Sequence, residues 1–405
     1  MKHFDPMEAM ATIRHEFGEH GGVNMSIEAS TTFTVMQAMI MPEIFHGLRG
    51  PDEGGCYLYG RHYNPTVYAL AHQLAAMEAT ENAYCTSSGM AAIAAAVLQL
   101  CRAGDHIVAS ETLYGGTYAL FNNFLPERSG TTTTFVDADD LGAVERAFTP
   151  RTRVLYVETI ANPTLVVADL PKLARIAHAH GAALVVDNTF SPLIVTPVRH
   201  GADVVVHSLT KFVSGSSDII AGVVCGSKEF VGSMMDVTSG SLMLLGPTMD
   251  PRVAFELSTR LPHLGVRMVE HGRRAQAMAE RLERAGLHVH YPGLATHPHH
   301  ARLAGMMNAD YGWGGIVAVD FGTIERANRF MEHLQLKEKF GFIAVSLGFT
   351  DTLMSASAYS TSSEMSPEDL ERAGISPGLV RMSVGITGTL EQRLAQLDAA
   401  LAVVR

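Results

Sequence analysis

A lysine follows one of the most apolar stretches of the chain. Residues 202–208 read ADVVVHS, and Lys211 comes three residues later. Burying an unpaired ammonium costs several kcal/mol, or about three pKa units. A lysine at this place therefore needs solvent, a charged partner or a covalent bond. Because solvent exposure is the usual arrangement at the end of a strand, the rest of the chain must decide among the three.

Two other stretches offer chemistry that would suit a flat, phosphorylated ligand. Ser88, Gly89 and Met90 precede the helical segment AAIAAAVLQL. The unpaired N–H groups and the dipole at such a helix start favour an anion such as phosphate. Tyr114 stands beside a Gly-Gly turn, where its ring could stack on a flat ligand. Each feature alone is an ordinary cap or a core tyrosine.

The remaining candidates lie next to the lysine or at the end of another apolar run. Asp187 ends the run AALVVD, and a carboxylate there could pair with a ring nitrogen and keep it protonated. Ser208 and Thr210 flank Lys211 and could bind further phosphate oxygens. The combined set supplies a phosphate cradle, a stacking ring, a pyridine-nitrogen partner and an amine. These are the parts needed to hold pyridoxal 5'-phosphate as a Schiff base on Lys211.

The elements that must position these residues are those of an α/β domain. Between residues 65 and 265, short apolar runs such as HIVAS, RVLYVET and DVVVHS alternate with amphipathic segments. This alternation predicts a mostly parallel sheet wrapped by helices. Ligands in such sheets bind beyond the carboxyl ends of the strands, which is where Asp187 and Lys211 fall.

The rest of the chain divides into an arm and a smaller domain. Residues 1–64 are irregular and rich in glycine and polar turns, which is typical of an arm. Residues 266–405 begin with a long helical pattern and continue with a second α/β pattern that includes GGIVAVDF and GLVRMSVG. We therefore expect a PLP-binding domain at 65–265 and a C-terminal domain at 266–405.

Composition excludes several classes of partner. The 405 residues carry a net charge of -11 without a Lys/Arg block, so nucleic acid and anionic membrane surfaces are not expected partners. The N-terminal segment lacks the apolar core of a secretion signal, which predicts a cytoplasmic protein. Neither the cysteines nor the histidine-rich stretch 296–300 has the spacing of a metal site, so no metal is expected. The cysteines are Cys56, Cys85, Cys101 and Cys225, read as reduced thiols.

Eight stretches, in order along essentially the whole chain, carry a family resemblance. The chain resembles the cystathionine/methionine γ-family of pyridoxal-phosphate enzymes of Cys/Met metabolism, and within it the plant-type methionine γ-lyases. The stretches are YGRHYNPT (59–66), CTSSGMAAI (85–93), TLYGGTYAL (112–120), ETIANPTL (158–165), VVDNTFSP (185–192), ADVVVHSLTKF (202–212), AVSLGFTDTL (344–353) and GLVRMSVG (378–385).

The resemblance implies a fold, an assembly and a role for each site residue. The fold would be aspartate-aminotransferase-like, the type I PLP fold, generally a homotetramer made of two dimers with shared active sites. Lys211, Tyr114 and Asp187 would be catalytic. The phosphate would be bound by one set of residues, joined by two from a neighbouring subunit: Ser88, Gly89, Met90, Ser208 and Thr210, with Tyr59 and Arg61. The substrate carboxylate would be held by Asn162, Ser346 and Arg381, the last as a bidentate clamp.

The resemblance also implies a reaction, γ-elimination of L-methionine to methanethiol, 2-oxobutanoate and ammonia. Val345 precedes Ser346 where relatives that handle cystathionine tend to have glutamate, and an apolar residue suits a thioether ending in methyl. Gly116 stands where bacterial methionine lyases usually carry cysteine. Cystathionine γ-lyase, cystathionine γ-synthase and O-acetylhomoserine sulfhydrylase share the same machinery and stay open as alternatives. A non-catalytic binding protein of the same fold would have no need of Lys211, Asp187 and Arg381 together.

Overall fold

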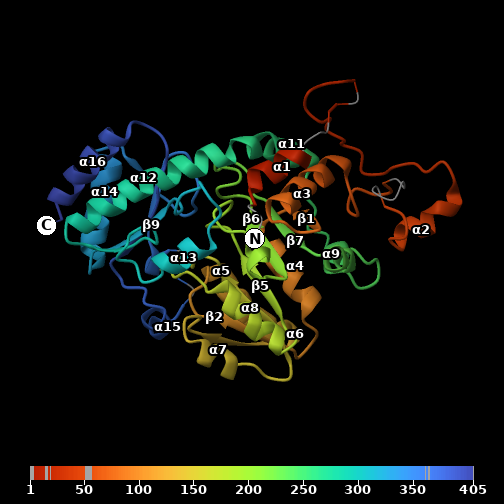
Figure 1. Ribbon diagram of the computed structural model, residues 1–405, viewed down its shortest axis with the longest axis horizontal. Helices are drawn as coiled ribbons and strands as arrows, with labels where there is room; N and C mark the ends of the chain where they lie inside the picture. The colour runs from red at the N-terminus through yellow and green to blue at the C-terminus, as the bar shows by residue number, and fades with distance from the viewer. Residues whose placement is uncertain are drawn as a thin grey trace.

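The computed structural model describes residues 4–13, 17–18, 20–50, 57–360, 362–363 and 365–404. Two sheets form the body of the molecule, and much of residues 20–50 extends away from this body (Figure 1). The larger sheet lies in the middle of the chain, and the smaller sheet is built from the C-terminal third.

The larger sheet has seven strands in the order β1-β7-β6-β5-β4-β2-β3. All of them run parallel except β7, which is antiparallel to both of its neighbours. The predicted mostly parallel sheet is therefore confirmed. The strands are β1 (Asn82–Thr86), β2 (His106–Ser110), β3 (Thr132–Val136), β4 (Thr152–Glu158), β5 (Ala183–Asp187), β6 (Val204–Ser208) and β7 (Gly222–Gly226).

Helices cover both faces of this sheet, which explains why its central strands are apolar on both sides. Helix α8 buries Leu170, Leu173, Ala174 and Ala177, the spacing of one helix face. The helices of this region are α3 (Pro65–Met77), α4 (Gly89–Leu100), α5 (Gly115–Ala119), α6 (Leu125–Ser129), α7 (Leu141–Arg146), α8 (Leu170–Ala179), α9 (Lys228–Met234), α10 (Ser241–Leu245) and α11 (Pro251–Arg260).

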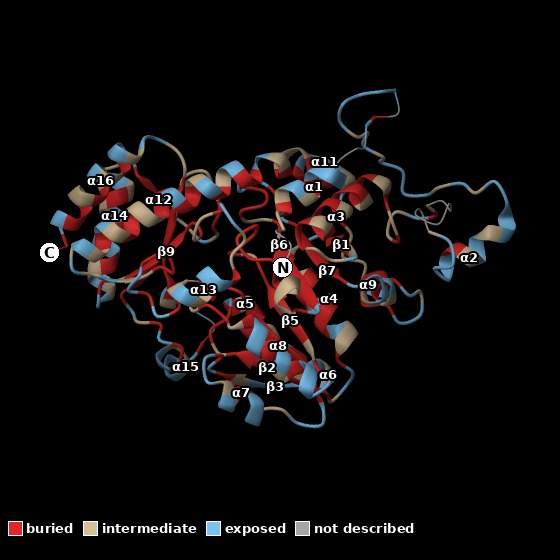
Figure 2. Ribbon diagram, in the orientation of Figure 1, coloured by how far each residue is buried: buried red, intermediate tan, exposed pale blue. Residues whose placement is uncertain are grey.

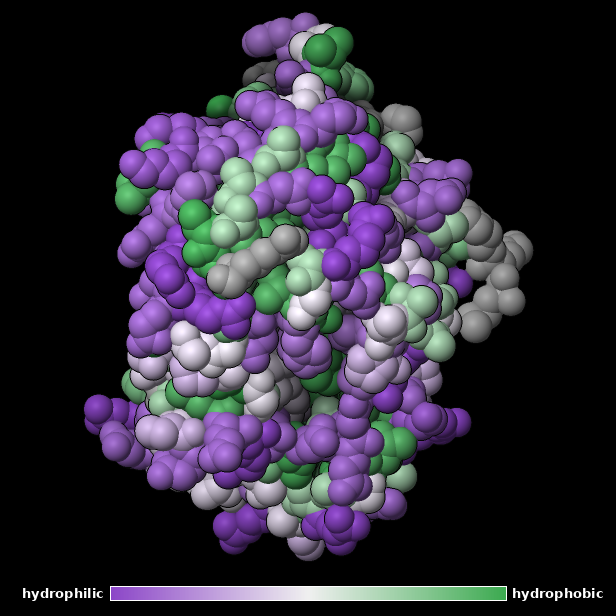
Figure 3. Space-filling model, turned by 90° about the vertical axis from the view of Figure 1, so that its left-hand side faces the viewer, coloured by the Kyte–Doolittle hydropathy of each residue, from purple (hydrophilic) through white to green (hydrophobic). Residues whose placement is uncertain are grey.

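The smaller sheet has the order β10-β11-β12-β9-β8 and is antiparallel except for the pair β10–β11. Its strands are β8 (His288–His290), β9 (Ile316–Asp320), β10 (Gly341–Ile343), β11 (Thr352–Ala356) and β12 (Leu379–Ser383). The helices are α12 (Leu264–Arg284), α13 (His300–Met306), α14 (Ile324–Leu336), α15 (Pro367–Arg372) and α16 (Leu390–Ala402). The end of the molecule that carries α14 and α16 is covered mostly by hydrophilic side chains (Figure 3).

The N-terminal segment has little core of its own. Helix α1 (Pro6–Ile13) packs against α3, and α2 (Met41–Phe45) lies far out on the segment. Most of the segment is exposed, whereas the two sheets are largely buried (Figure 2). The division into an arm at 1–64 and domains at 65–265 and 266–405 stays our proposal; its second boundary falls at the start of α12.

Three of the four cysteines, Cys85, Cys101 and Cys225, are buried free thiols, and Cys56 lies outside the described residues. Within the described ranges, no cluster of three or more His, Cys, Asp or Glu could hold a metal ion. Nor does any helix in the part of the chain that the structure describes have the length and apolarity needed to span a membrane.

An acid-sensitive contact joins the turn after β3 to the start of α13. Asp139, in the turn after β3, accepts a hydrogen bond from His299 Nε2 at 2.6 Å and another from Arg302 in α13. Burial alone would raise the pKa of Asp139, but these two partners lower it to about 2. The contact therefore stabilises the fold above the unfolded pKa of about 3.9, and the stabilisation is lost as pH falls toward 2.

We expect Asp139→Asn to lower the free energy of unfolding at pH 7 by about 1 kcal/mol, because the pair is partly screened by solvent. Urea unfolding at several pH values measures the effect, and the difference from the wild type should shrink below pH ~4. Glu145→Gln, which changes an exposed carboxylate on the neighbouring α7, is the control. A difference that stays constant down to pH ~3 would contradict the assignment.

Candidate active site

A cavity of about 390 Å³ lies where the carboxyl ends of β4, β5 and β6 face residues of the smaller sheet. Twelve of the fourteen residues predicted from the sequence line it. They are Ser88, Gly89, Met90, Tyr114, Asn162, Asp187, Ser208, Thr210, Lys211, Val345, Ser346 and Arg381. The volume is that of an ordinary small-ligand site.

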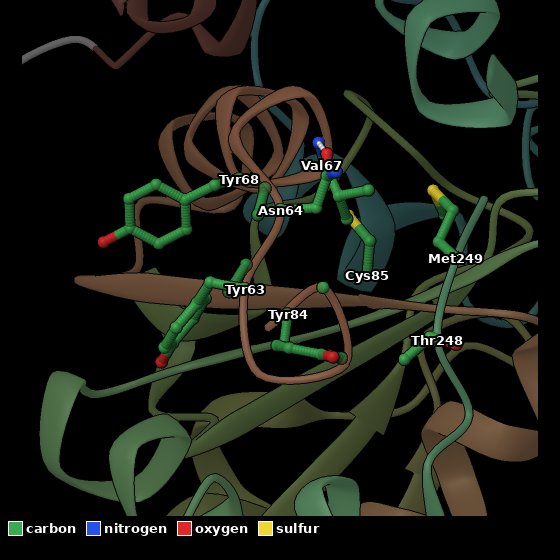
Figure 4. Close-up of a pocket in the computed structure, with 11 residues that line it drawn as sticks. Tyr63, Asn64, Val67, Tyr68, Tyr84, Cys85, Thr248 and Met249 are labelled. Atoms are coloured by element: carbon green, nitrogen blue, oxygen red, sulfur yellow. Dashed lines mark hydrogen bonds between the residues drawn. The ribbon is translucent and has the colours of Figure 1, made fainter. Parts of the chain in front are cut away.

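A second hollow lies beside α3, and Figure 4 shows the residues that line it. Its volume is about 10 Å³, and Tyr63, Asn64, Cys85 and Met249 are among its lining residues. A space of this size holds about one water molecule. It is too small for a substrate, whereas the larger cavity brings together twelve predicted residues and is therefore the candidate active site.

Lys211 reaches the cavity and contacts the smaller sheet's side of it. Its Nζ donates a hydrogen bond to Ser346 Oγ at 2.8 Å. Burial, together with the positive charge of Arg381, lowers the pKa of Lys211 to about 8. About one tenth of the amine is therefore unprotonated at pH 7, far more than for an ordinary lysine, and this is the state in which a lysine attacks a carbonyl group.

Asp187 ends β5 with its carboxylate in the cavity. Only 9% of the residue is exposed; Oδ1 accepts from Thr189 N at 2.9 Å and Oδ2 from Tyr156 O–H at 3.4 Å. Burial raises the pKa of Asp187, against the effect of these hydrogen bonds. A cationic N–H in the cavity would offset the cost of this buried charge, so the residue fits a protonated ring nitrogen.

The start of α4 forms the opposite end of the site. Ser88 is the N-cap, and its Oγ accepts from Ala91 N at 3.1 Å, whereas the first N–H groups of a helix have no partner within it. A Cβ on Gly89 would lie 2.7 Å from Ser208 Cβ, so the helix start and the end of β6 are packed as closely as glycine allows. Thr210 completes this end, where its Oγ1 accepts from Ala221 N at 3.0 Å. The arrangement fits a phosphate group.

Arg381, on β12, supplies a buried positive charge. It is 2% exposed; Nη1 donates to Asn162 Oδ1 at 3.0 Å and Nη2 to the Ser346 carbonyl at 2.9 Å. Its Nε has no hydrogen-bond partner among the described residues. Burial lowers the pKa of Arg381 to about 10, so the guanidinium stays charged at neutral pH. A substrate carboxylate would complete its coordination.

Tyr114 and Val345 lie at the more open side of the cavity. Tyr114 is 41% exposed and Val345 is 62% exposed. A Cβ on Gly116 would lie 2.6 Å from Tyr114 Cε1, so the tyrosine ring packs directly over the bare glycine. A larger residue at position 116 of this chain would force the ring to move.

Glu158, at the end of β4, is a site residue that the sequence reasoning missed. Its Oε1 accepts from Tyr114 N and its Oε2 from Asn162 N, each at 2.7 Å. Burial and the nearby Asp187 charge raise the pKa of Glu158. One carboxylate thus fixes the loops that carry two predicted site residues. Glu158 could have been predicted from its place in the stretch ETIANPTL, at the end of an apolar run.

Tyr59 and Arg61 do not line the cavity of their own chain. Arg61 Nη1 donates to the Met243 carbonyl at 2.6 Å, and its guanidinium lies 5.6 Å from the centre of the Tyr59 ring. The structure of one chain therefore does not bring these two residues together with the other twelve.

Comparisons with known proteins agree with this geometry. The family model of the Cys/Met metabolism PLP-dependent enzymes matches residues 8–402. Methionine γ-lyase from Arabidopsis thaliana is 59% identical over 98% of this chain and 90% of its own. L-methionine γ-lyase from Pseudomonas putida is 37% identical over 98% of this chain and 97% of its own.

Solved structures extend the comparison to the fold. O-acetylhomoserine (thiol)-lyase from Campylobacter jejuni, which contains N'-pyridoxyl-lysine 5'-monophosphate, superposes with a TM-score of 0.90 at 26% identity, over 98% of this chain and all of its own. Cystathionine γ-lyase from Lactobacillus plantarum, complexed with L-serine, gives a TM-score of 0.87 at 28% identity, covering 99% of each chain.

The fold and the cavity define a type I pyridoxal-phosphate enzyme. The chain belongs to the family of Cys/Met metabolism PLP-dependent enzymes, and its cofactor is pyridoxal 5'-phosphate. The residues that line the cavity fit this cofactor, with an amine, a carboxylate for the ring nitrogen and a helix start for the phosphate.

The close packing at Gly89 generates a test of the phosphate site. We expect Gly89→Ala to raise the dissociation constant of pyridoxal phosphate at least tenfold, or by ~1.4 kcal/mol, because the added methyl must push α4 away from Ser208. Fluorescence titration of the cofactor-free chain measures the affinity. Gly232→Ala, at a helical glycine with nothing within 4 Å of its added Cβ, is the matched control. Equal affinities in the two variants would contradict this assignment.

Proposed function

We propose that this chain catalyses the γ-elimination of L-methionine. With one water molecule, the reaction gives methanethiol, 2-oxobutanoate and ammonia. The observation that carries the proposal is the position of Ser346, whose hydroxyl accepts from Lys211 while its carbonyl accepts from Arg381. An amine and a carboxylate clamp thus meet at one residue, as an α-amino acid substrate requires.

Each side chain then has a defined task. Bound pyridoxal phosphate supplies an electron-withdrawing ring that stabilises negative charge on the substrate carbon next to the amino group. Arg381 and Asn162 bind the substrate carboxylate, and Lys211 moves protons at the substrate carbons. Asp187 keeps the ring nitrogen protonated. Tyr114 lies at the open side, where it would act as acid or base near the leaving sulfur.

Substrate choice rests on Val345. This side chain offers no partner to the distal ammonium and carboxylate of cystathionine, so those charges would lose water without compensation. Methionine ends in a methyl group and loses nothing there. The identity to a methionine γ-lyase supports the same choice. Cystathionine and O-acetylhomoserine with sulfide are the comparison substrates, since relatives with those names share the fold.

We expect Val345→Glu to raise the ratio of kcat/KM for cystathionine over methionine by roughly tenfold, which corresponds to ~1.4 kcal/mol. The glutamate gives the distal ammonium a partner and makes the methyl pocket polar. Val345→Gln is the control, because glutamine makes the pocket polar but has no negative charge for the distal ammonium. It should change this ratio much less. Methanethiol and cysteine release by purified, cofactor-loaded protein give the two rates. An unchanged ratio in the glutamate variant would show that Val345 does not set specificity.

We also propose that the enzyme is a homotetramer in which each active site is shared between two chains. Supporting this, Arg61 lies outside its own cavity and Tyr59 is 45% exposed, on an arm with little core. In this arrangement both residues bind the phosphate in the neighbouring subunit's site.

Mixing two weakened chains tests the shared site. A 1:1 mixture of Arg61→Ala and Lys211→Ala chains should regain up to about one quarter of the wild-type activity, because about half of the dimers are hybrids and half of the sites in a hybrid dimer receive both intact residues. Native mass spectrometry establishes that hybrids form, and homogeneous samples of each variant give the baseline. Hybrids with no more activity than that baseline would show that each site is built within one chain.

A further inference from the structure

The ends of β4, β5 and β6 present side chains to two opposite faces of the sheet, because neighbouring residues of a strand alternate. One residue of each end lines the cavity: Glu158, Asp187 and Ser208. The adjacent residue of each end is absent from the cavity lining and at most 1% exposed: Thr159, Asn188 and His207. These three polar residues belong to a buried cluster behind the active site.

Asn188 is the centre of this cluster. Its Oδ1 accepts from Thr159 Oγ1 at 2.8 Å and Ser191 Oγ at 2.7 Å. Its Nδ2 donates to Glu78 Oε1 at 3.1 Å and to the Val195 carbonyl at 2.9 Å. All four hydrogen-bonding positions of the amide are used, so the residue after Asp187 is held from four directions.

Glu78 and His207 add a carboxyl group and an imidazole to the cluster. Glu78 follows α3, is 1% exposed and accepts at Oε1 from His207 Nε2 at 2.6 Å. A buried carboxylate is costly unless a cation offsets it, and His207 is the titratable base in contact with it. Glu78 Oε2 and His207 Nδ1 have no further hydrogen-bond partner among the described residues.

The other titratable groups near this pair are thiols and Asp187. Cys225 on β7 lies near Glu78, and burial raises the pKa of Cys225 as it does that of neighbouring Cys85, so both stay neutral. On the cavity side, burial raises the pKa of Asp187, while its hydrogen bonds with Thr189 and then the positive charge of His207 lower it.

We propose that Glu78 and His207 are positioning residues for the cofactor ring. They form a buried ion pair that fixes the ends of β5 and β6 and keeps Asp187 ionised, so that Asp187 in turn holds a proton on the ring nitrogen. This inference rests on the proposed role of Asp187 and adds the two residues that support it from the far face of the sheet.

Loss of the Glu78–His207 pair should affect stability and ring protonation differently. His207→Gln leaves the Glu78 carboxylate buried without its partner, and Glu78→Gln leaves the His207 imidazole without its counterion; each should lower the urea midpoint of the loaded enzyme. The double variant has no such charge and should recover part of that stability. Ring protonation should not recover, because His207→Gln and the double variant have no imidazole behind Asp187, and the buried imidazole of Glu78→Gln loses its proton when it has no counterion. We expect the ring-nitrogen pKa to fall by about one unit or more, a tenfold change in the protonation equilibrium.

Solid-state ¹⁵N NMR of enzyme loaded with ring-¹⁵N pyridoxal phosphate, recorded against pH without substrate, measures this protonation directly. Asp187→Asn is the reference variant and should show the largest fall. If Asp187→Asn leaves the ring nitrogen unchanged, the proposed role of Asp187 is wrong. If it shows the fall but the double variant titrates like the wild type, the Glu78–His207 pair is only a packing element. If a single variant does not fold, the comparison of the double variant with the wild type and Asp187→Asn still tests the proposal.

Discussion

The active site depends on the close approach of two chain segments that belong to different sheets. A Cβ on Gly348 would lie 2.4 Å from the backbone nitrogen of Phe212, so a larger residue would force the segments apart. Gly348 N also donates to Ser383 Oγ at 2.8 Å, which attaches its segment to β12. This approach brings Ser346 to Lys211, and with it the carboxylate clamp of the smaller sheet to the amine of the larger one.

Charge is concentrated at this junction. Two cations, Lys211 and Arg381, and two carboxylates, Asp187 and Glu158, line one cavity. Burial shifts the pKa of each toward its neutral form. The site is therefore organised around groups that would be more stable beside complementary charge, and a zwitterionic amino acid with a phosphorylated cofactor brings such charge. The burial that makes these four charged groups unfavourable in the empty cavity therefore favours ligand binding, and it also shifts their pKa values for the reaction.

The sequence predicts the larger sheet well because its central strands are runs of Val, Ile and Leu between amphipathic segments. It does not predict β1 or β11, whose short stretches NAYCT and TLMSA mix polar and apolar residues and take their place from neighbouring strands. The sequence motifs predict twelve of the residues that line the cavity. It cannot show that Glu158 joins two loops, or that His207 faces away from Lys211, since both depend on side-chain direction. The roles of Tyr59 and Arg61 depend on a second chain.

The backbone at Ser346 limits which amino acids this position can accept. Its φ is +97°, a region that L side chains rarely adopt and that β-branched residues adopt least. Glycine would relieve the strain but has no hydroxyl to accept from Lys211, and threonine has the hydroxyl but adds branching at Cβ. Serine is the smallest residue that keeps the oxygen. Backbone geometry and hydrogen bonding together therefore leave few amino acids that can replace serine at position 346.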